Sequence, residues 1–318
     1  MANDPMVKKS SECFIRFRLV LIFLIFNKGN RMADMMALPI LVSPADLSKQ
    51  MTEVPMVIID TRDADTYLAE HIPGAVNLRE IFTFLATSSV EGLQDLKDSF
   101  SSQLGAIGLS GEETAVFYED SMNSGYGQSC RGYFLLTWLG YPKIQVLNGG
   151  LSAWKAAGLA TTTEVPTPTP VVFPISTAGS GVMVTLEDVK QKLGSEAVLM
   201  DVRDVDEWIG DSSSPYGKDF APRKGRLPGA KWLEWYRFMK PSGTGPVFKS
   251  PDEVKAECQT AGIKSSDEII LYCFKGARAS NTYLALKQAG FANVKMYFGS
   301  WNEWSRDPAL PIETGLPA

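Results

Sequence analysis

The sequence has one histidine, His71, among its 318 residues. A metal site built from several imidazoles is therefore excluded, and at most one cysteine-histidine pair could form. The four cysteines show no C-x-x-C spacing and are too few for a disulfide framework; they are Cys13, Cys130, Cys258 and Cys273. This cysteine usage favours a reducing compartment, the cytoplasm, and we expect neither a metal nor a cofactor.

The chain also lacks a positive net charge and a long apolar run. Its formal net charge is −5, which argues against a general nucleic-acid binder. The apolar stretch 14–26 is shorter than the ~20 residues that span a bilayer, so no stable membrane span is expected. Residues 1–36 form an N-terminal extension: a leader for export or membrane association through residues 14–26, or sequence upstream of a start at Met32.

From residue 37 onward, short apolar runs alternate with patterns typical of helices. With 45% hydrophobic residues, the chain is long enough for two domains with sizeable cores. In the first half we expect strands over residues 54–60, 114–118 and 144–147, and helices over residues 64–70 and 132–139. This alternation predicts an α/β fold with a parallel sheet that is covered by helices on both faces.

The second half of the sequence repeats the first. Three pairs of segments match in the same order: residues 57–63 with 198–204, residues 72–75 with 227–230, and residues 149–154 with 299–304. A tandem duplication is the simplest account. A segment rich in proline and threonine separates the copies and favours an extended linker. We expect domains at residues 37–160 and 182–318, with the linker at residues 161–181.

The clearest candidate site lies in the second domain. A buried strand over residues 268–272 leads into Cys273, a turn with a glycine, and a helix that begins near Ala279. Backbone N–H groups of such a loop and the helix N-terminus favour a thiolate, and Lys275 and Arg278 add positive charge. Tyrosine phosphatases place five residues between cysteine and arginine, whereas four lie between Cys273 and Arg278. The shorter loop suits one sulfur atom better than a phosphoryl group.

These segments resemble the rhodanese family of sulfurtransferases. Cys273, Gly276 and Ala279 match its C-x-x-G-x-x-A loop, and Asp201-Val-Arg-Asp204, Leu227-Pro-Gly-Ala230 and Gly299-Ser-Trp-Asn-Glu-Trp304 match elements around it. The resemblance implies two tandem rhodanese-like domains, each a parallel sheet flanked by helices on both faces. It also implies that an active loop is formed by the backbone of Phe274, Gly276, Ala277 and Ala279.

The resemblance further implies how the loop works. Cys273 would carry sulfur as a persulfide, and Lys275 stands where thiosulfate-preferring rhodaneses have lysine. Arg278, with Arg223 and Arg226 from the basic segment 222–226, would bind the anionic donor, since arginine suits such groups. Two departures affect the donor: Phe274 stands where thiosulfate enzymes often have arginine, and Arg278 stands where they often have threonine.

The duplication indicates which domain is catalytic. When residues 114–118 are aligned with residues 269–272, Glu119 falls, within one residue, where Cys273 stands. A carboxylate cannot replace a thiolate nucleophile, so the first domain is expected to be non-catalytic. Strand-end Asp60, Arg62, Asp201 and Arg203 are expected to brace the two sheets.

The resulting hypothesis is a thiosulfate sulfurtransferase that passes sulfur from Cys273 to cyanide or a thiol. Three alternatives stay open: a 3-mercaptopyruvate sulfurtransferase, a cysteine phosphatase or arsenate reductase, and a persulfide carrier or sensor that turns over poorly. The expected partners are a small anionic sulfur donor and a thiol or cyanide acceptor, with no nucleic acid.

Overall fold

The computed structural model describes residues 38–316 of the chain. The expected N-terminal extension, with its proposed leader or upstream start, lies outside the described residues. Within residues 38–316 no helix is long and apolar enough to cross a membrane.

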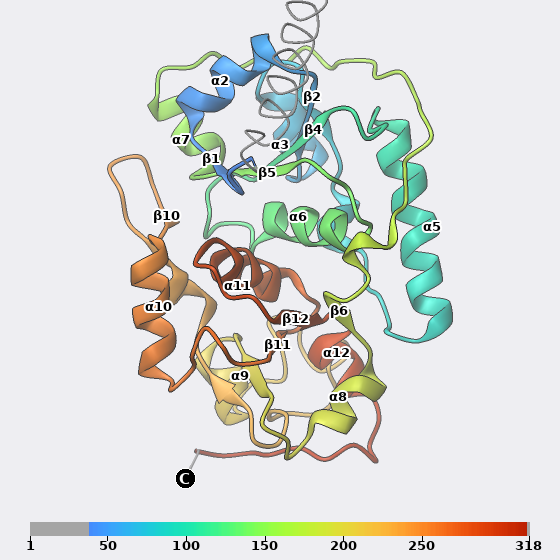
Figure 1. Cartoon of the computed structure of the whole chain (residues 1–318), viewed down its shortest axis with the longest axis vertical. Helices are drawn as coiled ribbons and strands as arrows, with labels where there is room; N and C mark the ends of the chain where they lie inside the picture. Colours follow the sequence, from blue (N-terminus) through green and yellow to red (C-terminus); the bar gives the residue numbers. More distant parts are fainter. Residues whose placement is uncertain (1–37, 317–318) are drawn as a thin grey trace, which may run out of the picture. The chain divides into compact units, whose positions relative to one another are not determined.

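The first domain is built on a five-stranded parallel sheet with strand order β1-β5-β4-β2-β3 (Figure 1). Three of its helices, α2, α3 and α5, begin at a capping side chain that accepts a backbone N–H; the caps are Ser43, Asp63 and Ser89. The elements are β1 (Leu41–Val42), α2 (Pro44–Glu53), β2 (Met56–Asp60), α3 (Ala64–Ala69), β3 (Val76–Asn77), α4 (Glu80–Thr83), α5 (Val90–Ala106), β4 (Thr114–Tyr118), α6 (Gln128–Trp138), β5 (Ile144–Leu147) and α7 (Gly150–Ala156).

The second domain repeats this architecture, with a parallel sheet of order β6-β12-β11-β7-β8. Position by position, β11 corresponds to β4 at the centre of the sheet. An antiparallel pair, β9 and β10, is added. The elements are β6 (Met183–Val184), α8 (Leu186–Lys192), β7 (Val198–Asp201), α9 (Val205–Ile209), β8 (Lys231–Trp232), β9 (Met239–Lys240), β10 (Val247–Phe248), α10 (Pro251–Thr260), β11 (Ile269–Tyr272), α11 (Ala277–Gln288), β12 (Val294–Tyr297) and α12 (Ser300–Trp304).

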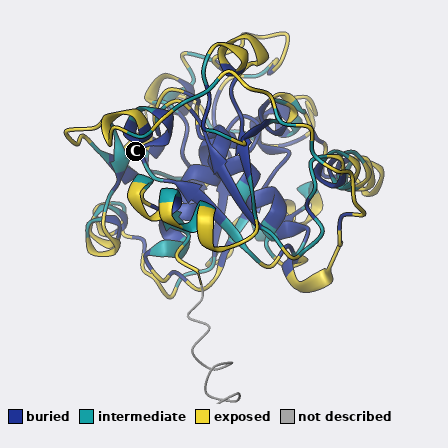
Figure 2. Ribbon diagram, turned by 90° about the horizontal axis from the view of Figure 1, so that it is seen from above, coloured by how far each residue is buried: buried dark blue, intermediate teal, exposed yellow. Residues whose placement is uncertain are grey.

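Both faces of each sheet are buried, which explains why the strands are almost wholly apolar. Neighbouring residues of one strand enter different cores: in β2, Ile58 belongs to the core that contains Leu47 of α2, whereas Ile59 belongs to the core that contains Phe100 of α5. In Figure 2 the strands are dark blue in the interior and the outer helices carry exposed yellow surface. The expected parallel sheets with helices on both faces are thus confirmed.

One hydrophobic core is shared by the two domains. Helices α6 and α11 pack against each other, and Figure 1 shows them side by side. Phe134 of α6 meets Tyr283 of α11 edge to face, with ring centroids 5.0 Å apart, and stacks at 5.9 Å on Phe298 beyond β12. Burying aromatic surface of this size stabilises the contact strongly. The two helices that begin near the strand-end loops are therefore fixed to each other.

The same brace holds the carboxyl end of each sheet. In the first domain the Arg62 guanidinium donates to both oxygens of Asp60, and the Tyr118 hydroxyl donates to Asp60 at 2.6 Å. The second domain has the same bonds among Arg203, Asp201 and Tyr272, the last at 2.7 Å. All three groups are buried, so each carboxylate needs these donors.

The segment between the domains has little regular structure. Residues 157–182 contain one short 3-10 helix, Thr177–Gly179, and an isolated bridge that joins Thr162 to His71. Phe173 from this segment is buried and stacks on Tyr141 at 5.4 Å. The connection is thus held to the first domain by specific contacts.

Candidate active site

Cys273 stands directly after β11, where the chain turns into α11. Its side chain is buried, with 1% of the residue exposed, and its sulfur accepts a hydrogen bond from the Gly276 N–H at 3.2 Å. α11 has 12 residues, so its N-terminus presents unpaired N–H groups and a partial positive charge to the sulfur. This arrangement places positive partial charge beside the sulfur.

Contacts with α12 fix the backbone of the loop. The Cys273 N–H donates to the Ser300 hydroxyl at 3.2 Å, the Cys273 carbonyl accepts from Trp301 N–H at 3.0 Å, and the Phe274 carbonyl accepts from Asn302 N–H at 2.9 Å. Ser300 itself has a positive φ of 55°, which is uncommon for a residue with a side chain. The loop is therefore held in place before any substrate arrives.

Gly276 is needed where the loop enters the helix. It caps α11 with φ +86°, and a Cβ atom at this position would lie 2.9 Å from the ring of Phe298. Any other residue would have to adopt a left-handed conformation and also move Phe298. Ala277 and Ala279 follow as buried small residues at the start of the helix.

A small pocket, with a cavity volume of about 10 Å³, lies over the cysteine. It has aromatic walls from both domains, and Tyr126 and Phe82 come from the first domain. Tyr216 packs against Phe274 with ring centroids 5.0 Å apart. The lining residues are Phe82, Tyr126, Pro215, Tyr216, Cys273, Phe274, Lys275, Ala277 and Arg278.

Lys275 lies inside this pocket. Its ammonium lies 4.0 Å from the centroid of the Phe82 ring and 5.1 Å from that of Tyr216, so aromatic faces partly replace its water. Burial, with the positive charge of Arg131 next in importance, lowers the pKa of Lys275 to about 7, although Cys273 acts in the opposite direction. The lysine can therefore gain or lose its charge near neutral pH.

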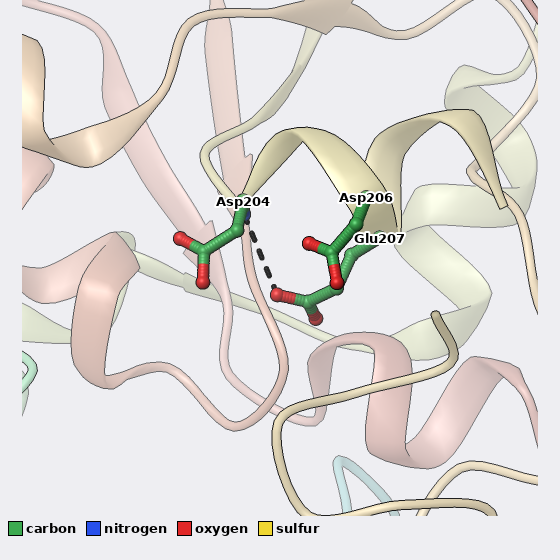
Figure 3. Close-up of side chains that lie close together, drawn as sticks. All are labelled: Asp204, Asp206 and Glu207. Carbon is green, nitrogen blue, oxygen red and sulfur yellow. Dashed lines mark hydrogen bonds between the residues drawn. The ribbon is translucent and has the colours of Figure 1, made fainter. Parts of the chain in front are cut away.

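Arg278 also lines the pocket, but its charge has a partner. The guanidinium donates to both oxygens of Glu207, at 2.6 and 3.1 Å, and lies 3.2 Å from Asp204. Burial opposes the charge of Arg278, yet Glu207 holds the pKa of this arginine above its ordinary value. Figure 3 shows Asp204, Asp206 and Glu207 gathered at the start of α9, with the Asp204 N–H directed at Glu207. The arginine pairs with Asp204 and Glu207 of this acidic group and helps to fix α9 beside the loop.

Arg223 and Arg226, which the sequence predicts to bind the donor, do not line the pocket over Cys273. Arg223 donates to the backbone carbonyls of Ser305, Leu310 and Trp304 at 2.7 to 3.0 Å. Arg226 stacks on Trp208, pairs with Glu313 and donates to the Trp208 and Gly315 carbonyls. The donors of both guanidinium groups are used to fasten the C-terminal segment.

Arg131 and the aromatic walls were not found from the sequence. Arg131, on α6 of the first domain, is fully buried and interacts electrostatically with Cys273 and Lys275. The available signal was a charged residue inside the otherwise apolar run 130–139, and buried charges of this kind usually have a function or a partner. Phe82 and Tyr126 come from the other domain, so no pattern in the sequence near Cys273 indicates that they line the pocket.

Glu119 stands in the first domain at the position of Cys273. Tyr118 and Tyr272 are paired with Asp60 and Asp201, and Glu119 follows Tyr118 as Cys273 follows Tyr272. Its carbonyl accepts the Leu151 N–H of α7, just as the Cys273 carbonyl accepts that of Trp301. The carboxyl group accepts the Ser129 hydroxyl at 2.6 Å, and burial raises the pKa of Glu119 to about 7.

Comparison with known proteins identifies the family. The protein-family model of the rhodanese-like domain matches this chain twice, over residues 43–157 and 185–307. The chain belongs to the rhodanese family. This rhodanese is 31% identical over 291 residues to the thiosulfate sulfurtransferase of Azotobacter vinelandii, covering 89% of this chain and 100% of that protein. It is 31% identical over 277 residues to the thiosulfate sulfurtransferase of Pseudomonas aeruginosa, covering 87% of this chain and 97% of that protein.

Other relatives show how far the rhodanese fold extends. The sulfur carrier protein TtuD of Thermus thermophilus is 30% identical over 289 residues, covering 87% of this chain and 97% of that protein. The wild-type structure of EanB superimposes with a TM-score of 0.76 and 26% identity, covering 88% of this chain and 70% of EanB. Another EanB structure holds hercynine and matches with the same TM-score of 0.76. The chain is an enzyme, a sulfurtransferase of the rhodanese type.

Proposed function

We propose that the rhodanese takes the sulfane sulfur of thiosulfate and carries it as a persulfide on Cys273. The main support is the position of the cysteine sulfur, which accepts the Gly276 N–H at 3.2 Å at the start of α11. A thiolate in such a place is a ready nucleophile and needs no general base. Relatives named thiosulfate sulfurtransferase support thiosulfate as the donor.

The proposed first step forms one sulfur-sulfur bond and breaks another. The Cys273 thiolate attacks the outer sulfur of thiosulfate, and sulfite leaves with the electron pair of the broken bond. The loop N–H groups stabilise the anionic sulfur before and after transfer. Protonated Lys275 attracts the oxygens of the donor, and the buried rings of Phe82 and Phe274 restrict access of water.

The second step removes the sulfur. Cyanide or a thiolate attacks the outer sulfur of the persulfide, forming thiocyanate or a new persulfide and returning the Cys273 thiolate. Because the donor product leaves before the acceptor reacts, ping-pong kinetics are expected. We further propose that residues 182–318 form the catalytic domain, that residues 37–160 form a non-catalytic domain with Glu119 in place of the cysteine, and that residues 161–181 link them.

We also propose that this chemistry takes place in the cytoplasm. A persulfide cycle needs a reduced Cys273, and Cys130, Cys258 and Cys273 are all free cysteines in the structure. Reducing compartments keep thiols in this form. Fractionation of the source cells, with sulfurtransferase activity as the readout, tests the location; activity confined to an exported fraction would contradict it.

Intact-protein mass spectrometry tests the persulfide directly. After incubation with thiosulfate and no acceptor, the wild-type protein should gain one sulfur, ~32 Da, on its activated cysteine and lose it when cyanide is added. Cys273→Ser should gain nothing, and Cys258→Ser serves as a control that keeps the site. If thiosulfate loads no sulfur but 3-mercaptopyruvate does, the donor assignment is wrong; loading without turnover would indicate a persulfide carrier.

A further inference from the structure

One buried arginine differs from the others in its partners. Within residues 38–316, five arginines are at most 5% exposed, and four of them form an ion pair with a carboxylate. Those four are Arg62, Arg203, Arg226 and Arg278. The fifth, Arg131, is 0% exposed and forms no ion pair with any carboxylate of the described residues. A buried positive charge without an anion is costly, so Arg131 calls for an explanation.

Arg131 lies between the first domain and the loop that holds Cys273. Its guanidinium carbon stands 4.7 Å from the centroid of the Phe298 ring, and the same ring lies against Gly276 of the loop. Its donors go to the carbonyls of Ile81 and Phe82 at 2.8 Å and of Phe84 at 2.7 Å. Arg131 thereby fixes the segment that places the Phe82 ring 4.0 Å from the Lys275 ammonium.

The charges around Cys273 come from four elements. Lys275 belongs to its own loop, Arg278 to α11, Arg131 to α6, and the Tyr216 hydroxyl to the segment after α9. Glu207 and Asp204 pair with Arg278, whereas Lys275 and Arg131 form no ion pair with a carboxylate within residues 38–316. Arg79 is a further positive charge that acts on Lys275. Burial lowers the pKa of Arg131 to about 10, and Cys273 partly offsets this effect. Arg131 thus stays protonated at neutral pH.

We propose that Arg131, in the domain that has Glu119 at the position of Cys273, is a positioning residue for sulfur transfer. Its buried charge favours the anionic form of the Cys273 sulfur, and its guanidinium holds Phe82 against Lys275. The anion missing from its surroundings is the thiolate, the persulfide or the incoming donor. This inference rests on the proposed role of Cys273 and adds that the first domain supplies part of the electrostatic environment of the site.

The proposal predicts that removing the charge of Arg131 raises two titration midpoints, that of Cys273 and that of Lys275. In Arg131→Met the Cys273 thiolate loses a favourable charge, so the midpoint of thiol ionisation should rise by about one pKa unit or more. Lys275 loses a nearby like charge, so its midpoint should rise as well. The thiosulfate KM, which should increase as wild-type Lys275 loses its proton near pH 7, should then increase only at higher pH.

The experiment measures the rate of Cys273 alkylation by iodoacetamide against pH, without any donor. Peptide mapping separates Cys273 from Cys13 and from the buried Cys130 and Cys258. Arg223→Met is the matched control, because Arg223 also donates to three backbone carbonyls and lies outside the pocket. Both variants should lose thermal stability. At pH values below the midpoint, alkylation should be about 10-fold slower than wild type in Arg131→Met alone.

Arg131→Lys and Arg131→Gln form a second pair, for use if the methionine variant does not fold. Both can donate to the carbonyls of residues 81–84, but only lysine keeps the charge. The lysine variant should stay near the wild-type midpoint, and the glutamine variant should show the shift. If Arg131→Met and Arg131→Gln titrate like Arg223→Met, Arg131 is only a structural brace and the proposal fails. Since alkylation uses no thiosulfate, this failure is separate from failure of sulfur loading.

Discussion

The two strand-end loops of this rhodanese start from the same framework and end in different chemistry. Tyr118 and Tyr272 each donate to an aspartate that is also bound by an arginine. The carbonyl of the residue after each tyrosine accepts an N–H from a short helix, α7 or α12. The helix cap then follows Cys273 after three positions, at Gly276, whereas it follows Glu119 after eight, at Gly127. The sheet places the two loops at equivalent positions. The length of each loop and the side chain after the tyrosine, Cys273 or Glu119, determine its chemistry.

The longer loop has another use. Around Glu119 it leaves a buried carboxyl that is bonded to Ser129, and near its end it presents Tyr126, with φ 54°, to the pocket of the other domain. The cap residue Gly127 lies so close to Ala277 that a Cβ would stand 2.7 Å from its carbonyl oxygen. The first domain therefore serves as one wall of the site in the second.

Substitution of Cys273, alone or together with Glu119, should have the largest effect. Cys273→Ser should lower sulfur transfer by roughly 10³-fold or more, because the nucleophile is lost while the fold is kept. Adding Glu119→Cys to that variant should restore nothing, since the loop over residues 119–127 contains no lysine to attract the donor as Lys275 does. Thiocyanate formation from thiosulfate and cyanide is the measurement. Recovered activity would mean that the framework alone, without the short loop, suffices.

Gly276→Ala should have a smaller but specific effect. The new Cβ would meet the Phe298 ring at 2.9 Å, so the loop should shift and transfer should fall by about 10-fold or more. Gly290→Ala is a matched control: its φ of +85° equals the +86° of Gly276 within a degree, but open space surrounds it. Both should lose about 1–2 kcal/mol of stability from the left-handed conformation. Equal losses of activity would show that Phe298 does not hold the loop.

Local patterns in the sequence predicted the sheet well. The strands expected at residues 114–118 and 144–147 match β4 and β5, and α11 begins at Ala277, near the expected Ala279. Short apolar runs carry this information locally. α6 begins at Gln128, four residues before the expected start, because Gly127 caps it in a left-handed conformation without a capping side chain. α5 (Val90–Ala106) was not predicted, although Ser89 caps it.

The site was predictable only where one segment forms it. Cys273, Lys275 and Arg278 lie in one loop and helix start, and the pocket includes all three. Arg131 and Phe82 lie more than 100 residues away in sequence, and only the packing of α6 against α11 brings them near. Arg223 and Arg226 were assigned to the donor because they are basic and adjoin a family motif. The sequence does not show that the guanidinium N–H groups of these two arginines donate to backbone carbonyls.

Glu119 provides the smallest test, one of stability. Burial raises its pKa from 4.5 to about 7 in the folded protein. Between these values the folded state binds more protons than the unfolded state, so stability is fully present below pH 4.5 and declines as pH rises toward 7. Glu119→Gln, which cannot ionise, should be more stable than wild type at pH 8, by roughly 2–4 °C in Tm for each kcal/mol. The variant should match wild type near pH 4.5, where Glu119 is protonated in the folded protein.

The exposed Glu53→Gln is the control for charge alone, and the Tm values are followed by circular dichroism. A Glu119→Gln difference that is the same at both pH values would mean that the carboxyl stays ionised in the loop, and that this loop, like that of Cys273, stabilises an anion.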